Sequence, residues 1–110
     1  MYEKFGQFIN GEWKHADSGE TYEVINPATE EIIGNASKAS SSDVQKALKA
    51  ADQGFKAWRE TPAWERAKLL RRISELVREN TESLVEWMTL EGGKTYNDGF
   101  AEVGATADVF

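Results

Sequence analysis

The feature that most constrains this chain is a change of pattern near residue 40, from strand-and-turn segments to amphipathic helical repeats. Asn10-Gly11 lies between two short apolar segments and predicts a hairpin, because both central residues of a type I′ turn need positive φ. The β-branched and aromatic run Thr21–Ile25 predicts a strand, and Asn26-Pro27 ends it because proline has no N–H for a ladder. Ile32-Ile33 predicts a further short strand, closed by Gly34 and the polar stretch around Ser37. This part therefore predicts a β-ribbon from about residue 7 to residue 36.

Apolar residues recur at helical spacing from about residue 42 to the end, and they predict three or four helices. The isolated piece is thus expected to be α+β, a β-ribbon followed by helices. Capping and turn residues predict where the helices begin and end. These are a capping box of Ser42 with Gln45, a cap at Thr61 with Pro62 as the first helical residue, a boundary at Asn80-Thr81, a stop at Gly92-Gly93 and a cap at Asn97.

Composition excludes several classes of protein. A chain of 110 residues has room for one small domain, and its net charge of -6 opposes binding to nucleic acid or to anionic lipid. Cysteine is absent, which excludes a disulfide framework, a thiolate metal site and a cysteine nucleophile within these residues. No secretory leader is visible, and no apolar run approaches the ~20 residues that span a bilayer. We therefore expect no nucleic-acid partner, no membrane partner and a cytoplasmic location.

The residues that could carry chemistry have simpler interpretations. His15 is the only histidine and stands in a polar turn, so we expect an exposed imidazole without a metal role. Gly92-Gly93-Lys94-Thr95 resembles part of a phosphate loop, but it follows a helix and lacks the upstream glycine, so a helix C-cap is expected. Glu30-Glu31 is not expected to form an acid–base pair, because neighbours on a strand face opposite sides. A core or interface position is expected for the tryptophans Trp13, Trp58, Trp64 and Trp87.

Several segments closely resemble the aldehyde dehydrogenases. Phe8–Trp13 reads FINGEW, and Glu23–Gly34 reads EVINPATEEIIG. The resemblance continues through Leu90-Glu91-Gly92-Gly93-Lys94 to Phe110, so it covers essentially the whole chain. Thr61–Ala67, which reads TPAWERA, is most similar to the semialdehyde-oxidising branch, such as the succinate-semialdehyde dehydrogenases.

The resemblance implies an α/β fold in which residues 1–110 are the N-terminal segment beside the dinucleotide-binding domain. It implies oxidation of an aldehyde or semialdehyde to a carboxylic acid with NAD or NADP. In the family a cysteine thiolate attacks the aldehyde, an oxyanion hole holds the oxyanion, hydride passes to nicotinamide, and a glutamate-activated water releases the acid. None of these groups has a matching position here. We therefore expect no catalytic residue, no cofactor-binding residue and no NAD or NADP bound to this chain alone.

The resemblance also implies a possible monovalent cation site. Some family members bind the cation through backbone carbonyls that align with Val24 and Ile25 and through an acidic side chain that aligns with Glu91. Glutamate is longer than the aspartate of the family pattern, so its reach differs. A plain surface carboxylate is the alternative interpretation.

The last predicted helix carries apolar residues up to the final position of the chain. Because no capping residue follows Phe110, we expect a piece of a longer enzyme, inactive by itself. The alternative is a short helical interaction module without catalysis. We expect a homo-oligomer formed through this helix and the one before it, because burying each large apolar side chain contributes about 1.5–3 kcal/mol; the alternative is a monomer whose last helix folds back onto the others. The residues expected to associate are Phe100, Val103, Ala107 and Phe110, with Trp87 and Met88.

Overall fold

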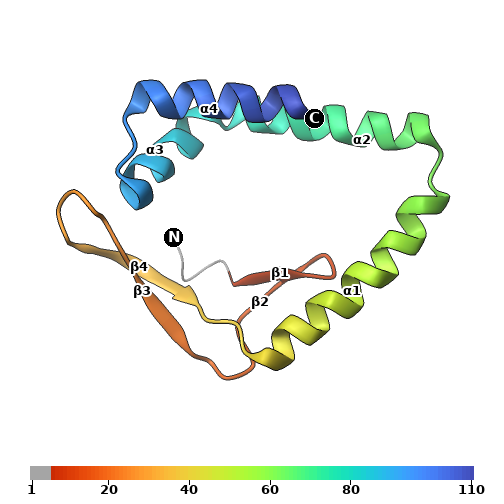
Figure 1. Ribbon diagram of the computed structural model, residues 1–110, viewed down its shortest axis with the longest axis horizontal. Helices are drawn as coiled ribbons and strands as arrows, with labels where there is room; N and C mark the ends of the chain where they lie inside the picture. The colour runs from red at the N-terminus through yellow and green to blue at the C-terminus, as the bar shows by residue number, and fades with distance from the viewer. Residues whose placement is uncertain (1–5) are drawn as a thin grey trace. The chain divides into compact units, whose positions relative to one another are not determined.

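The computed structural model describes residues 6–110, and the chain falls into two compact units. Unit 1 comprises the residues up to Ile25 together with Ile32–Glu60. Unit 2 comprises Asn26–Glu31 together with Thr61–Phe110. Among the described residues, unit 1 contains four strands and the first helix, and unit 2 contains three helices and the loop between the last two strands (Figure 1).

The first two strands form an antiparallel hairpin in unit 1, β1 (Gln7–Ile9) with β2 (Glu12–Lys14). Phe8 lies opposite Trp13, and their ring centroids are 5.2 Å apart, which makes a cross-strand aromatic pair. The two turn residues between the strands have φ angles of 55° and 79°, as a type I′ turn requires. The predicted hairpin is confirmed.

The next two strands form a second antiparallel pair, β3 (Thr21–Ile25) with β4 (Ile32–Ser37). The described strands therefore make two separate two-stranded sheets and not the single ribbon that the sequence predicts. β4 ends at Ser37, in the polar stretch predicted to close it, but Gly34 does not end the strand, because it pairs with Val24. The ladder is irregular between Val24 and Ile25, where β4 has one extra residue.

Four helices follow, and with the two strand pairs they confirm the α+β character expected of this piece. β1 lies against the first helix within unit 1. Among residues 6–110, no helix combines the length and the apolar character that crossing a membrane would require. The helices are α1 (Ser41–Glu60) in unit 1, and α2 (Ala63–Glu79), α3 (Thr81–Gly92) and α4 (Tyr96–Val109) in unit 2.

Two helix starts in unit 2 differ from the sequence prediction by one or two residues. Pro62 has a ψ of 143° and is the N-cap of α2, so Thr61 lies one residue too early to cap it and Pro62 is not yet helical. Thr95 caps α4, because its extended backbone lets its side chain accept the N–H of Asp98 at 3.3 Å. Asn97 already lies inside that helix. The backbone conformation of the residue before each helix, and not the residue type alone, determines which residue is the N-cap.

The packed part of unit 2 is where α4 lies against α2 and α3 (Figure 1). Val85 of α3 is fully buried, and Val103 and Ala107 of α4 are 4% and 1% exposed. Gly99 approaches Val85 so closely that a Cβ at position 99 would lie 2.9 Å from Val85 Cγ1. A glycine and small side chains thus bring α4 close to α3.

This packing corrects the predicted self-association face. The two buried residues of α4 belong to that face, but they pack inside unit 2 because the last helix folds back onto α2 and α3. Phe100 and Phe110 are each 44% exposed, and Trp87 and Met88 are half-buried. Part of the expected interface is therefore internal packing.

Large apolar side chains remain exposed on both units. On α1, Leu48 and Phe55 are exposed although they lie on the face predicted to be apolar. Trp13, Trp58 and Trp64 are each more than a third exposed, so the described residues provide no core for them. Of the two positions predicted for these three tryptophans, the core position is wrong and the interface position stays a prediction, because the sequence pattern identifies an apolar face but not what covers it.

Candidate functional site

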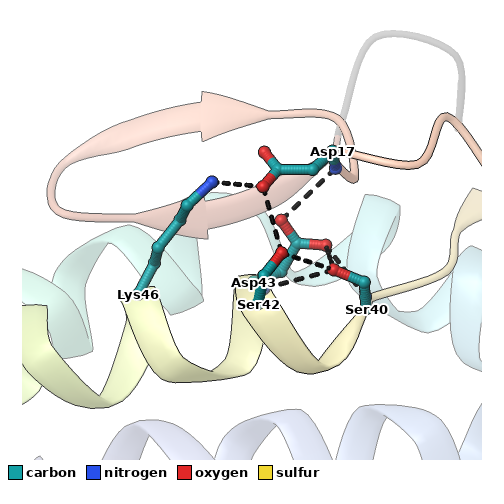
Figure 2. A network of polar contacts seen from close by, with 5 residues as sticks. All are labelled: Asp17, Ser40, Ser42, Asp43 and Lys46. Atoms are coloured by element: carbon teal, nitrogen blue, oxygen red, sulfur yellow. Dashed lines mark hydrogen bonds and ion pairs between the residues drawn. The ribbon is translucent and has the colours of Figure 1, made fainter.

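A network of polar side chains surrounds the N-terminus of α1, and Figure 2 shows it. Ser40 Oγ accepts a hydrogen bond from the N–H of Asp43 at 3.3 Å, and the N–H of Ser40 donates to Asp43 Oδ2 at 2.8 Å. The Ser40 hydroxyl also donates to Asp43 Oδ2 at 2.6 Å. These reciprocal bonds form a capping box whose cap is Ser40.

The capping box therefore begins two residues before Ser42, where the sequence analysis places it. Because α1 begins at Ser41, Ser42 lies in the first turn, and its hydroxyl donates to Asp17 Oδ2 at 3.1 Å. The spacing of Ser40 and Asp43 matches the Ser-x-x-acid pattern, so a sequence signal for the correct cap does exist.

Asp17 connects the turn after β2 to the same network (Figure 2). Its N–H donates to Asp43 Oδ1 at 3.3 Å, and its carboxylate forms an ion pair with Lys46 of α1. The N–H of the preceding Ala16 donates to Ser37 Oγ at 2.8 Å, at the end of β4. The turn, the end of β4 and the start of α1 are thus held together inside unit 1.

The charges of this network are stabilised where they lie. Asp43 is 3% exposed, and hydrogen bonds from the Ser40 hydroxyl and then the Ser40 N–H lower its pKa below the ordinary 3.8. Burial acts in the opposite direction and does not outweigh these bonds. The hydrogen bond to Asp17 raises the pKa of Lys46. Both pKa shifts favour the charged forms, so the hydrogen bonds and the ion pair of the network stabilise the fold.

We expect the Asp43 carboxylate to make the free energy of unfolding of the chain fall as the pH is lowered. The pKa of Asp43 is lower in the folded chain than in the unfolded chain. Its carboxylate therefore contributes fully to the free energy of unfolding above the unfolded pKa, and this contribution is lost as the pH falls through the folded-state pKa. The free energy of unfolding in urea, measured from about pH 6 downward, should therefore fall less in Asp43→Asn than in the parent chain. Asp52→Asn, which changes an exposed carboxylate on the same helix, is the control. An equal fall in the parent and in Asp43→Asn would contradict the expectation.

A cavity of about 420 Å³ lies beside this network in unit 1. His15, Lys49 and Gln53 contribute to its lining, and His15 is exposed as predicted. The part of the chain that the structure describes contains no group of three or more His, Cys, Asp or Glu side chains placed to hold a metal ion. The carboxylates of Asp17 and Asp43 also line the cavity, but they are already engaged in the network.

The three residues of the predicted cation site lie on two elements. Val24 and Ile25 lie at the irregular step of β3 in unit 1, where a bulge disturbs the regular pairing of the ladder. Glu91 lies in the last turn of α3 in unit 2, and its side chain is exposed. Backbone carbonyls with a carboxylate form a set of hard oxygen donors, which is the chemistry that hard cations prefer.

Gly92-Gly93-Lys94-Thr95 ends one helix and starts the next. Gly93 is the C-cap of α3 with φ 65°, Lys94 pairs with Glu102, and Thr95 caps α4. The predicted helix C-cap is confirmed. Among the described residues, the strands form antiparallel hairpins, and β4 leads into α1 through residues 38–40, which include no glycine. The glycine turn between strand and helix that holds the pyrophosphate in doubly wound dinucleotide-binding folds is therefore not found among residues 6–110.

Glu30-Glu31 lies in the loop between β3 and β4 and not on a strand. The prediction that these two carboxylates face opposite sides of a strand is therefore wrong, because neither residue is part of a strand. Glu30 has a φ of 62° and donates its N–H to the carbonyl of Asn26 at 2.8 Å, while Glu31 Oε2 accepts the hydroxyl of Thr29 at 3.1 Å. These bonds shape the loop.

Comparison with known proteins agrees with the resemblance. The model of the aldehyde dehydrogenase family matches residues 13–110. The chain is 41% identical over 101 residues to a malonate-semialdehyde dehydrogenase of Halalkalibacterium halodurans, covering 92% of this chain and 21% of that protein. It is 43% identical over 100 residues to a glutarate-semialdehyde dehydrogenase of Pseudomonas putida, covering 91% of this chain and 21% of that protein.

A solved structure is similar over the same part. It is betaine aldehyde dehydrogenase from Staphylococcus aureus in complex with NAD+, which matches with a TM-score of 0.91 and 31% identity over 94% of this chain and 21% of that one. The chain thus spans about a fifth of the length of the relatives that it matches. Together with the FINGEW and NPAT segments, these matches show that the chain belongs to the aldehyde dehydrogenase family.

Proposed function

We propose that this chain is the N-terminal part of an enzyme that oxidises a semialdehyde to a carboxylic acid with NAD or NADP. The observation that carries the proposal is the match of 41% and 43% identity to two semialdehyde dehydrogenases over nine tenths of the chain. The chain has no cysteine, so the nucleophile belongs to a segment outside it. NAD or NADP supplies the hydride acceptor when bound, and no residue described in this chain takes part in that step.

The role that we propose for residues 1–110 is to support the rest of the enzyme. Exposed apolar side chains on α1, such as Leu48 and Phe55, are surface that a folded protein normally covers. We assign these faces to contact with the remaining four fifths of a family-length chain. We further propose that the enzyme is a cytoplasmic homo-oligomer. Phe100 and Phe110 are exposed and are proposed to lie near the contact between subunits, whereas Val103 and Ala107 of the originally predicted face are buried inside unit 2.

We also propose that Val24, Ile25 and Glu91 contribute to a monovalent cation site. The support is the resemblance, together with the ladder irregularity at the first two residues. Two backbone carbonyls and a carboxylate would supply oxygen ligands.

The proposed activity predicts that the purified 110-residue chain forms no NADH or NADPH with malonate or glutarate semialdehyde. The physical reason is the absence of a thiolate nucleophile. Translation of the parent gene beyond Phe110, followed by assay of the longer product with both cofactors, should restore turnover. Turnover by the 110-residue chain, or a stop codon directly after Phe110, would contradict the proposal and favour the helical interaction module.

A further inference from the structure

The cavity beside the polar network of unit 1 is formed by the β1–β2 hairpin and α1 together. Gln7 of β1 and Lys14 of β2 are paired across the hairpin, and both line the cavity. Lys46, Lys49 and Gln53 line it from α1, where residues three and four positions apart share one side of the helix. Because β1 lies against α1 within unit 1, the whole cavity is built inside one unit.

One hydrogen-bond donor of the cavity lining has no partner. Gln7 is half-buried, and its Nε2 atom is shielded from solvent but makes no hydrogen bond within the part of the chain that the structure describes. Leaving a buried polar group unpartnered is costly, so in folded proteins such a group usually bonds to a water molecule, an ion or a ligand. An amide nitrogen only donates. The partner that Gln7 requires is therefore an acceptor.

Lys49 supplies a positive charge to the same cavity. The other two lysines of the lining are paired, Lys14 with Glu12 at 2.8 Å and Lys46 with Asp17. Lys49 is exposed, and it has neither an ion pair nor a hydrogen bond with any of residues 6–110. Its ammonium group is therefore available to an anion.

The two carboxylates of the lining do not cancel this charge. Asp17 is neutralised by its ion pair with Lys46, and the oxygens of Asp43 accept hydrogen bonds from Ser40 and from the N–H of Asp17 (Figure 2). Asp43 also lies in the first turn of α1, where the helix dipole stabilises a negative charge. Lys49 follows it by six residues, which is about 9 Å further along the helix axis. The unused charge of the lining is therefore positive.

We propose that this cavity binds a small oxyanion, either a phosphate or a carboxylate. Its oxygen atoms are acceptors that carry negative charge, which is what an unpartnered N–H and an unpaired ammonium both require. The Gln7 amide donates to one oxygen, and Lys49 supplies the opposite charge. The cavity volume of about 420 Å³ lies within the range of about 300–1,000 Å³ that is usual for small-molecule sites. The proposal does not depend on the proposed function, because all of these residues lie in unit 1.

Titration of the 110-residue chain with sodium phosphate and, separately, with sodium malonate tests the site. Malonate offers only carboxylates, so the anion that saturates at the lower concentration distinguishes the two sources of oxygen. The ionic strength is held constant with sodium chloride. The side-chain N–H signals of Gln7 in two-dimensional proton–nitrogen NMR spectra should shift and saturate. Signals that do not shift, or that shift without saturating with either anion, would overturn the site.

Lys49→Gln should raise the dissociation constant at least about tenfold, because it removes a hydrogen bond from a charged donor. Lys56→Gln is the matched control. It removes the same charge from the same helix, but Lys56 pairs with Asp52 and is not part of the cavity lining, so the dissociation constant should stay nearly unchanged. Equal weakening in the two variants would show that only the net charge matters, and it would overturn the site.

Gln7→Met separates binding from folding. Methionine is similar in length but has no N–H, and replacing an unpartnered buried amide with it should not lower the free energy of unfolding measured without the anion. The dissociation constant should nevertheless rise as it does in Lys49→Gln. A lower free energy of unfolding, or an unchanged dissociation constant, would overturn the assignment of Gln7 as a ligand. Because Lys49 is exposed, Lys49→Gln still tests the site if Gln7→Met does not fold.

Discussion

Gly99→Ala is expected to destabilise unit 2 by a net amount of about 0.5–2 kcal/mol, although alanine is the better helix former. The new methyl group would lie 2.9 Å from Val85 Cγ1 and 3.5 Å from the Cβ and Cγ2 atoms of Val85. Val85 is fully buried, so it has no free space into which it can move. The overpacking cost of about 1–3 kcal/mol therefore exceeds the gain in helix propensity of about 0.5–1 kcal/mol. Urea unfolding followed by circular dichroism measures the difference.

Gly104→Ala is the matched control for that change. It lies on the same helix, but a Cβ there would meet nothing within 4 Å. It should therefore show only the gain in helix propensity and stabilise the chain by about 0.5–1 kcal/mol. If both variants shifted the unfolding free energy in the same direction, the close approach of α4 to α3 at Gly99 would be wrong.

Ser40→Ala is expected to lower the free energy of unfolding by about 0.5–2 kcal/mol, the usual cost of losing an N-cap. The change removes the acceptor for the N–H of Asp43 and the hydroxyl that donates to the Asp43 carboxylate at 2.6 Å. It should also reduce the dependence of stability on acid, because the Ser40 hydroxyl is the largest cause of the lowered Asp43 pKa.

Ser41→Ala is the control for the cap. Ser41 is the first residue of α1 and is exposed, so removing its hydroxyl leaves the capping box intact. Thermal or urea unfolding of both variants at neutral pH makes the comparison. A loss in Ser41→Ala as large as that in Ser40→Ala would show that Ser40 does not cap the helix.

Elements governed by neighbouring residues could be predicted from the sequence. The Asn10-Gly11 turn requires positive φ at adjacent positions, and Gly93 supplies the left-handed C-cap of α3. Helix caps were less reliable. Three consecutive serines, Ser40–Ser42, each offer a cap, and the sequence signal that distinguishes Ser40 is the acidic Asp43 three residues after it.

For the candidate site, too, some features could be predicted from the sequence and others could not. The family and the absence of a nucleophile could be derived from segments such as Glu23–Gly34 and from the missing cysteine, because a motif is a local property of the chain. The network of Asp17, Asp43 and Lys46 could not, since it joins a turn to a helix that follows it by more than twenty residues.

The sequence by itself determined where strands and helices form, which positions are apolar, and to which family the chain belongs. Hydrogen bonding and steric preference act between neighbours, so these properties are visible without a fold. Only the tertiary structure decided that Val103 and Ala107 are buried while Phe55 and Trp64 are exposed. It alone brought Pro27 against Gly93. Burial and contact between distant segments depend on which helix and strand faces pack together. The periodicity of apolar residues cannot show this, because it is the same for a covered face and for an exposed one.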